Sequence, residues 1–245
     1  MNMDARVKIV LSTLSKTYPR AKIVLSYSSP WELLIAVILS AQCTDRVVNK
    51  VTKVLFRKYP TLDFYTKADL SAFEKHIKST GFYHNKAKNI LGAARRIRET
   101  YRGRVPKTME ELLTIPGVAR KTANVVLGNA YGVIEGIAVD THVIRLSQRL
   151  RLVPIDKIGG KHPAFVSHST MQQYNNVTID FYKDASPLKI EQELMKVIPK
   201  KTWFSLTYQL IDHGRAVCKA KNPKCQACPL SSYCPVRREQ KDGNP

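Results

Sequence analysis

The chain has 245 residues, 44% of them hydrophobic, and its 11 glycines and 13 prolines are ordinary numbers for a folded protein. Its formal charge of +21 favours a polyanionic partner, either nucleic acid or an acidic membrane surface. The longest apolar run, Leu33 to Leu39, is too short to cross a bilayer, and the N-terminus lacks the apolar core of a signal peptide. We therefore expect a cytoplasmic protein with no membrane partner.

Basic residues concentrate in two stretches of the chain. Residues 86–104 contain seven basic residues against one acidic residue, and residues 213–238 contain six basic residues and no acidic one. A generally basic, solvated surface is the simpler interpretation. The charge by itself does not distinguish DNA, RNA and lipid as partners.

Most of the chain carries the start and stop signals of short helices. Small polar residues that cap helix N-termini precede apolar segments, and glycine follows some of them. No convincing alternating strand pattern is present, so we predict an all-α fold. The signals are Ser29 with Pro30 and Glu32 for a helix to Ala41, Asp69 or Ser71 for a helix to Gly81, Thr108 with Glu111, Asp140 before Thr141 to Leu150, Ser186 with Pro187, and Trp203 to His213 with a stop at Gly214.

One segment, residues 156–186, resists assignment to helices. It contains Gly159, Gly160, Pro163 and a polar run, and about thirty residues without evident structure are unusual inside a compact domain. We expect a surface loop here, and the alternative is a loop that contacts DNA or docks a partner. The motif Asn176-Val177-Thr178 matches a glycosylation acceptor, which we attribute to chance.

Four of the five cysteines lie close together near the C-terminus. Four thiolates within so short a stretch can hold a [4Fe–4S] cluster or a tetrahedral zinc ion, and a reducing compartment argues against disulfides. Zinc modules usually pair two Cys-x-x-Cys arms, whereas one arm here has that form, which favours the cluster. The spacing is C-x6-C-x2-C-x5-C, formed by Cys218, Cys225, Cys228 and Cys234.

Three lysines, Lys219, Lys221 and Lys224, lie between these cysteines. On a loop that a metal group stiffens, basic side chains are well placed to contact phosphates. The alternative is a purely structural cluster with solvated lysines, and the two interpretations are compatible. Cys43 stands apart and is interpreted as a small buried residue.

The sequence from Leu113 to Ala123 predicts a helix, a tight turn and a second helix. Pro116 and Gly117 mark the turn, and the second helix places Ala123, with Val126 and Leu127, on an apolar face. Backbone N–H groups at such a turn and helix start can bind a phosphate. A hairpin that binds through its backbone recognises DNA shape and not base sequence.

Two residues are candidates for catalysis. Lys121 lies just beyond the turn, where the helix start and Arg120 both favour the neutral amine, which is the form that attacks a sugar carbon to give a Schiff base. The alternative is a solvated surface lysine. Asp140 precedes a predicted helix and fits an N-cap, and a capped carboxylate could also stabilise positive charge that develops as a base leaves.

Taken together and in this order, the motifs resemble those of the endonuclease III family of helix-hairpin-helix DNA glycosylases. The resemblance covers residues 29–155 and resumes over residues 188–235. The motifs that carry it are Leu39 to Asp45, Ile115 to Ala123, Val139 to His142 and the four clustered cysteines.

The resemblance implies two helical domains that flank a DNA-binding cleft. Residues 22–133 would form a helical domain with the hairpin, and residues 1–21 plus 134–245 would carry the [4Fe–4S] cluster loop. Within the second domain, residues 156–186 look like an insertion relative to the family. We expect a monomer.

The resemblance also implies a base-excision repair enzyme that binds double-stranded DNA with damaged bases or abasic sites, associated with the nucleoid. It would be a bifunctional DNA glycosylase and AP lyase that removes oxidised pyrimidines, with Lys121 attacking C1′ of the flipped nucleotide, Asp140 assisting, and β-elimination following. Gln42 would fill the gap in the helix and Phe82 would wedge beside it. The implied DNA contacts are Gln42, Phe82, Gly117, Ala119, Arg120, His142, Lys219, Lys221 and Lys224.

Two positions depart from the family pattern: Ala119 replaces a glycine often seen in the hairpin, and Cys43 replaces a common alanine. Three other functions stay open on the residues alone. They are a monofunctional mismatch or adenine glycosylase on the same scaffold, a non-catalytic iron–sulfur DNA-binding protein such as a redox sensor, and a zinc-bound nucleic-acid adaptor. The presence of both Lys121 and Asp140 favours the lyase.

Overall fold

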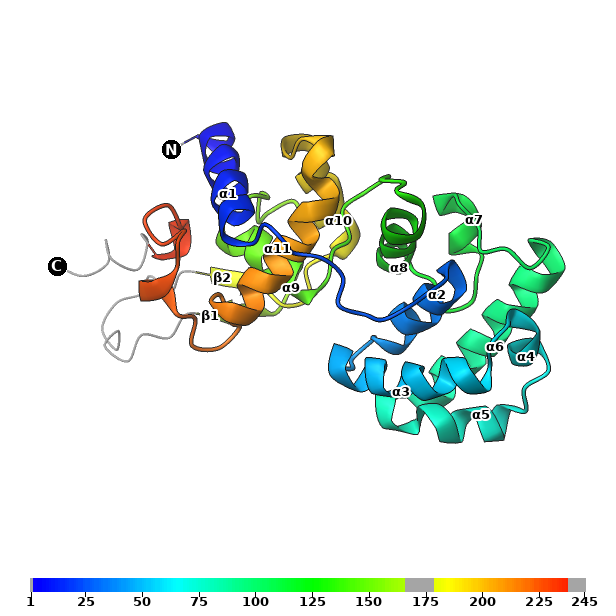
Figure 1. The fold of residues 1–245 in the computed structure, drawn as a ribbon. Coiled ribbons are helices and arrows are strands. Elements are labelled where there is room, and N and C mark those ends of the chain that lie inside the picture. The colour runs from blue at the N-terminus through cyan, green and yellow to red at the C-terminus, as the bar shows by residue number, and fades with distance from the viewer. Residues whose placement is uncertain (1, 166–178, 238–245) are drawn as a thin grey trace. The chain divides into compact units, whose positions relative to one another are not determined.

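The computed structural model describes residues 2–165 and 179–237 (Figure 1). The chain divides into two compact units: a continuous unit, Ile23–Glu135, and a discontinuous unit, Met1–Lys22 with Gly136–Pro245. Nearly all regular structure is helical, which confirms the all-α class. No helix among the described residues is long and apolar enough to span a bilayer.

The continuous unit is built around α2, Pro30–Leu39, whose residues from Leu33 to Leu39 are all buried. A helix that is apolar on every side must be covered on every side, and α2 packs against α3, α6 and α8. Each fully buried leucine or isoleucine contributes roughly 1.5–3 kcal/mol. The other elements are α3 (Asp45–Lys58), α4 (Leu62–Thr66), α5 (Leu70–Ile77), a 3-10 turn (Lys78–Thr80), α6 (Tyr83–Thr100), α7 (Met109–Leu113), α8 (Arg120–Val126) and a π turn (Leu127–Tyr131).

The predicted helix starts of this unit are confirmed, with one change of detail. The Ser29 side chain accepts a hydrogen bond from the Glu32 amide at 3.2 Å, but the Glu32 carboxylate accepts from the Ser28 amide instead of returning to Ser29. Asp69, and not Ser71, caps α5 by accepting from the Ala72 amide at 2.8 Å. The α2 helix ends at Leu39, two residues before the predicted end.

The discontinuous unit packs α11, Trp203–Ala216, against α1, Met3–Thr17, and α9, Thr141–Arg149. Gly214 lies inside α11, so its predicted role as the helix stop is wrong. A Cβ atom at Gly214 would lie 2.5 Å from the Nδ1 atom of His142. This glycine therefore permits close packing of two helices. The remaining elements are α10 (Pro187–Val197), β1 (Pro163–Phe165), β2 (Ile179–Tyr182), and 3-10 turns at Lys200–Thr202 and Cys225–Ala227.

Within residues 156–186, where the sequence shows no strand pattern, the structure contains a short pair of strands, which leaves the all-α class unchanged. Here β1 and β2 form an antiparallel pair that aligns Pro163 with Tyr182 and Ala164 with Phe181. Strands of three and four residues are too short to display an alternating pattern, and their pairing joins positions that are distant in the sequence. Residues 166–178, with the Asn176-Val177-Thr178 motif, lie outside the described residues.

Candidate functional site

The predicted hairpin is present between α7 and α8. The Val118 amide donates to the Ile115 carbonyl at 3.1 Å, and Gly117 between them has φ +79°. A Cβ atom at Gly117 would lie 2.8 Å from the Cβ of Asn89 on α6, so both the backbone conformation and the packing require glycine. Ala119 is the N-cap of α8 and makes no side-chain cap bond, so the amides of the first turn are not satisfied from that side chain.

Lys121 lies in the first turn of α8 and is half-buried. The predicted apolar face of this helix is buried, with Ala123, Val126 and Leu127 each fully covered. This face packs against α2 and α7, so the backbone that carries Lys121 is anchored in the core of the continuous unit. An anchored backbone limits the positions that the amine can reach.

Gln42 and Phe82 lie on two different loops of the continuous unit, and both adopt left-handed backbone conformations. Gln42 has φ +51° and is exposed, and Phe82 has φ +47° with 64% of its surface exposed. A bulky residue with positive φ is strained, and an exposed phenylalanine gives up the stabilisation that burial would provide. Such features concentrate at sites that act on a ligand.

One buried lysine joins these two loops. Lys86, on α6, is 4% exposed, and its Nζ atom donates to the carbonyls of Leu39 and Thr80, each at 2.8 Å. Leu39 ends the helix that leads to Gln42, and Thr80 lies two residues before Phe82. Burial lowers the pKa of Lys86, an effect that the nearby Cys43 partly opposes.

The interpretation of the basic stretch 86–104 as a solvated surface is wrong for Lys86. A signal for its burial is present in the sequence, because Lys86 lies in register with the buried residues Ile90, Ala93 and Ile97 on one face of α6. The interpretation of Cys43 as a buried residue is also wrong, since this residue is half-buried.

Asp140 caps α9, as predicted. Its Oδ1 atom accepts from the amides of His142 and Val143, both at 2.8 Å. The cap therefore fixes the carboxylate through one oxygen.

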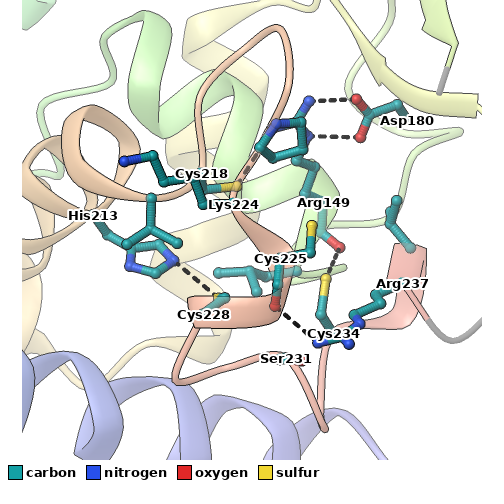
Figure 2. A pocket seen from close by; sticks show the side chains of 14 residues that line it. Arg149, Asp180, His213, Cys218, Lys224, Cys225, Cys228, Ser231, Cys234 and Arg237 are labelled. Atoms are coloured by element: carbon teal, nitrogen blue, oxygen red, sulfur yellow. Dashed lines mark hydrogen bonds and ion pairs between the residues drawn. The ribbon is translucent and has the colours of Figure 1, made fainter. Parts of the chain in front are cut away.

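At the opposite end of α9, Arg149 lines a pocket together with the four clustered cysteines (Figure 2). None of the four forms a disulfide, and Arg149 donates from Nη1 to the Cys218 sulfur at 3.4 Å. Burial raises the pKa of Cys228 to about 11, and it raises the pKa values of Cys225 and Cys234 as well. Because a thiol must lose its proton to bind a metal, the positive charge of a metal group would have to offset this effect of burial.

Two further polar residues around this pocket were not singled out from the sequence. His213 is buried and lies between the Tyr18 hydroxyl, 3.1 Å from Nδ1, and the Cys228 sulfur, 3.6 Å from Nε2. Burial lowers the pKa of His213 to about 4. Arg145 donates to the carbonyls of Cys218 and Gly214, at 3.1 and 3.3 Å. The only signal for Arg145 was its place, four residues before Arg149, on the buried face of α9.

The donor set fits an iron–sulfur cluster. Four thiols line one pocket, and four cysteine thiolates are the usual ligands of such a cluster. Apolar walls from Leu150, Val217 and Val236 cover it. The three loop residues Lys219, Lys221 and Lys224 are exposed.

The predicted site residues are divided between the two units. Gln42, Phe82, Gly117 and Lys121, with their neighbours Ala119 and Arg120, belong to the continuous unit. The discontinuous unit contains Asp140, His142, the four cysteines and the three loop lysines. Helix α9 connects Asp140 at its start to Arg149 at the cysteine pocket.

Comparison with known proteins agrees with this architecture. Residues 35–160 match the HhH-GPD superfamily of base excision DNA repair proteins, and residues 218–234 match the iron–sulfur binding domain of endonuclease III. Endonuclease III of Synechocystis sp. is 47% identical over 94% of this chain and 92% of its own length. That of Bacillus subtilis is 42% identical over 94% of this chain and 91% of its own length.

A solved structure, described as a trapped endonuclease III–DNA covalent intermediate in an estranged-adenine complex, aligns with a TM-score of 0.82. It is 40% identical and the alignment covers 98% of this chain and all of that one. The chain therefore belongs to the endonuclease III family of base excision DNA repair proteins. It is a DNA-binding enzyme with DNA glycosylase and AP lyase activity, and it has an iron–sulfur cluster as a cofactor, in the domain that residues 218–234 match.

Proposed function

We propose that the chain removes oxidised pyrimidines from duplex DNA and then cleaves the strand, using Lys121 as the nucleophile. The observation that carries this proposal is the position of Lys121, in the first turn of α8 immediately after the Gly117 turn. The trapped covalent protein–DNA intermediate of a relative 40% identical to this chain supports covalent chemistry. A hairpin that contacts phosphate would place the amine beside a sugar.

In the proposed reaction, the neutral Nζ of Lys121 attacks C1′ while the C1′–N bond breaks and the base leaves with that bonding pair. Loss of a proton from nitrogen and opening of the sugar ring give an imine. Removal of a C2′ proton then expels the 3′ phosphate by β-elimination. A protonated lysine has no lone pair for the first step, so the reaction requires the neutral amine.

Asp140 would stabilise the positive charge that develops on the sugar as the base departs. Its Oδ1 atom is committed to the amides of His142 and Val143. Two charge-assisted hydrogen bonds hold the carboxylate in one orientation. A carboxylate fixed in advance costs no reorganisation during the reaction.

DNA would be held by residues of both units, with Gln42 and Phe82 replacing the flipped nucleotide in the stack. Their positive φ angles, their exposure and their joint anchoring by Lys86 support this assignment. The exposure of Lys219, Lys221 and Lys224 on the cysteine loop supports phosphate contacts there. Further proposed contacts are Gly117, Ala119, Arg120 and His142.

We assign the hairpin to a domain of residues 22–133 and the cluster to a domain of residues 1–21 plus 134–245, with residues 156–186 as an insertion. The compact units Ile23–Glu135 and Met1–Lys22 with Gly136–Pro245 support these limits. The protein would act as a monomer on DNA with damaged bases or abasic sites, associated with the nucleoid. A bound iron–sulfur cluster would stiffen the loop that carries Lys219, Lys221 and Lys224.

Borohydride trapping tests the nucleophile. The parent protein, incubated with a duplex that carries one thymine glycol, should give a covalent protein–DNA adduct, and Lys121→Ala should give none. Lys75→Ala, which removes one exposed charge from the same unit, is the matched control and should trap like the parent. Base release without any adduct would instead identify a monofunctional glycosylase, and no action on the lesion would refute the proposed substrate.

A second variant separates the two roles of Asp140. Asparagine caps helices as well as aspartate does, so Asp140→Asn should keep α9 while removing the charge. Base release should fall by about 100-fold or more, as in other sites that lose a charge-stabilising group. An Asp140→Asn protein with parental base release would show that Asp140 is a helix cap alone.

A further inference from the structure

Strand β2 is anchored to the C-terminal end of α9. The fully buried side chain of Gln148 donates to the Tyr182 carbonyl at 3.1 Å and accepts from the Tyr182 amide at 2.7 Å. The side-chain amide of Gln148 therefore pairs with the backbone of β2 as a neighbouring strand would. The Ser186 amide also donates to the Ile158 carbonyl at 2.9 Å, which joins the two ends of the segment of residues 156–186.

Asp180, on β2, is buried and faces the guanidinium of Arg149 (Figure 2). Its Oδ1 atom accepts from Nε at 2.7 Å and its Oδ2 atom accepts from Nη2 at 2.5 Å. Both oxygens are thus engaged in a bidentate pair. The centroid of the Phe181 ring lies 5.2 Å from the guanidinium carbon. A fork-to-fork pair fixes the plane of the guanidinium, which a single hydrogen bond would not do.

The rest of the guanidinium holds the loop that begins at Cys218. Its Nη1 atom donates to the Lys219 carbonyl at 2.6 Å and to the Cys218 sulfur at 3.4 Å, and Nη2 donates to the Ala220 carbonyl at 3.1 Å. Arg149 therefore stands between the carboxylate of β2 and the first cluster ligand. Hydrogen bonds to ligand sulfur and outer partners of ligands tune the stability of metal sites.

We infer that Asp180 is a positioning residue for the iron–sulfur site: it orients Arg149 so that the guanidinium holds Cys218, Lys219 and Ala220 in place. The β1–β2 strand pair then has a role, which is to help retain the cluster by supplying this carboxylate. The inference depends on the iron–sulfur site alone and is independent of which lesion the enzyme removes.

The test measures how fast the cluster is lost from the full-length, cluster-loaded protein in air, followed by its visible absorbance. Asp180→Asn keeps the shape of the side chain and removes its charge, and we expect cluster loss about 10- to 100-fold faster than in the parent. Asp156→Asn, the same substitution at an exposed position of the same segment, should behave as the parent does. Helix content, followed by circular dichroism in the same samples, should persist while the cluster is lost.

A double substitution tests whether Asp180 acts through Arg149. Arg149→Lys keeps the positive charge but cannot form the fork, so it should also accelerate cluster loss. Adding Asp180→Asn to Arg149→Lys should produce little further acceleration. Where Asp180→Asn does not accumulate as folded protein, Asp180→Glu, which displaces the carboxylate by one methylene, serves in its place.

Three results would overturn the inference. The first is a parental rate of cluster loss in the Asp180 variants. The second is acceleration in the double variant that multiplies the two single effects. The third is cluster loss that only follows the unfolding of the helices, since that would make Asp180 a general structural residue.

Discussion

Lys86 in the continuous unit and Arg149 in the discontinuous unit are both buried cations that hold loops through carbonyl oxygens. Lys86 holds Leu39 and Thr80, and Arg149 holds Lys219 and Ala220. They differ in their counter-charge. Arg149 pairs with Asp180, whereas Lys86 forms no ion pair with a carboxylate in the part of the chain that the structure describes.

This difference has opposite effects on the two pKa values. Burial lowers the pKa of Lys86. Burial also acts to lower the pKa of Arg149, but the hydrogen bonds with Asp180 and the charge of Cys218 outweigh it and raise that pKa overall. Arg149 therefore stays charged at any pH of interest, whereas the shift at Lys86 acts against its charged form. A permanent cation suits a permanent cofactor site, and a lysine suffices where two loops need only be fixed in place.

The largest expected effect comes from Arg149→Met. This change leaves the Asp180 carboxylate buried without a partner and removes the contacts to the cysteine loop, so the free energy of unfolding should fall by about 3–5 kcal/mol. Anaerobic urea unfolding of cluster-loaded protein measures it. A loss below about 1 kcal/mol would mean that the buried pair contributes no more than an exposed one.

Lys86→Met should have a smaller effect on stability. Two buried carbonyls lose their donor, at about 1–3 kcal/mol each, but removal of a buried charge offsets part of that cost, so we expect a net loss of about 1–3 kcal/mol in urea unfolding. Equal losses of unfolding free energy for Lys86→Met and Arg149→Met would show that the counter-charge makes no difference between the two cations.

The same variant should also impair excision in a manner that depends on the substrate. If Lys86 positions Gln42 and Phe82, excision should fall by about tenfold for a lesion in a stable base pair and less for one in a mismatch, because a poorly paired base costs less to flip. Single-turnover excision measures both rates, on two duplexes that differ only in the base opposite the lesion. An equal loss on the two substrates would assign Lys86 to general stability.

A pH series should distinguish the two cations by a smaller effect. The pKa of Lys86 in the folded protein lies below its ordinary value of 10.5. Between the folded and the unfolded pKa, the unfolded chain therefore binds more protons than the folded chain does. The parent should therefore gain stability relative to Lys86→Met as pH rises through this window. Urea unfolding at several alkaline pH values measures the difference. A gap between the two proteins that does not change with pH would contradict the lowered pKa.

The smallest effect is expected at the exposed end of the β1–β2 hairpin. Asp184 accepts hydrogen bonds from the amides of Lys161 and His162 and from the His162 ring, and these bonds lower the pKa of Asp184. A lowered carboxyl pKa stabilises the folded state above the unfolded pKa and ceases to do so as pH falls through the native pKa. Asp184→Asn should thus be mildly destabilised at neutral pH and match the parent in strong acid, as measured by thermal unfolding.

The sequence by itself determined the features that depend on near neighbours in the chain. The capping of α5 by Asp69, of α7 by Thr108 and of α9 by Asp140 follows from hydrogen bonds that span two or three residues. The hairpin turn at Gly117 and the close spacing of the four cysteines are local in the same sense. Such patterns lie in consecutive residues, so the order of the amino acids is enough to recognise them.

Only the tertiary structure decided which charged residues are buried and what they hold. Lys86 reaches across 47 positions to Leu39, Asp180 lies 31 positions beyond Arg149, and Lys219 lies 70 positions beyond it. The β1–β2 pairing and the close approach that requires Gly214 likewise join segments that are distant in sequence. A buried lysine or arginine is the same residue in the sequence as an exposed one. Its partners are set by tertiary packing, which a local sequence pattern does not encode.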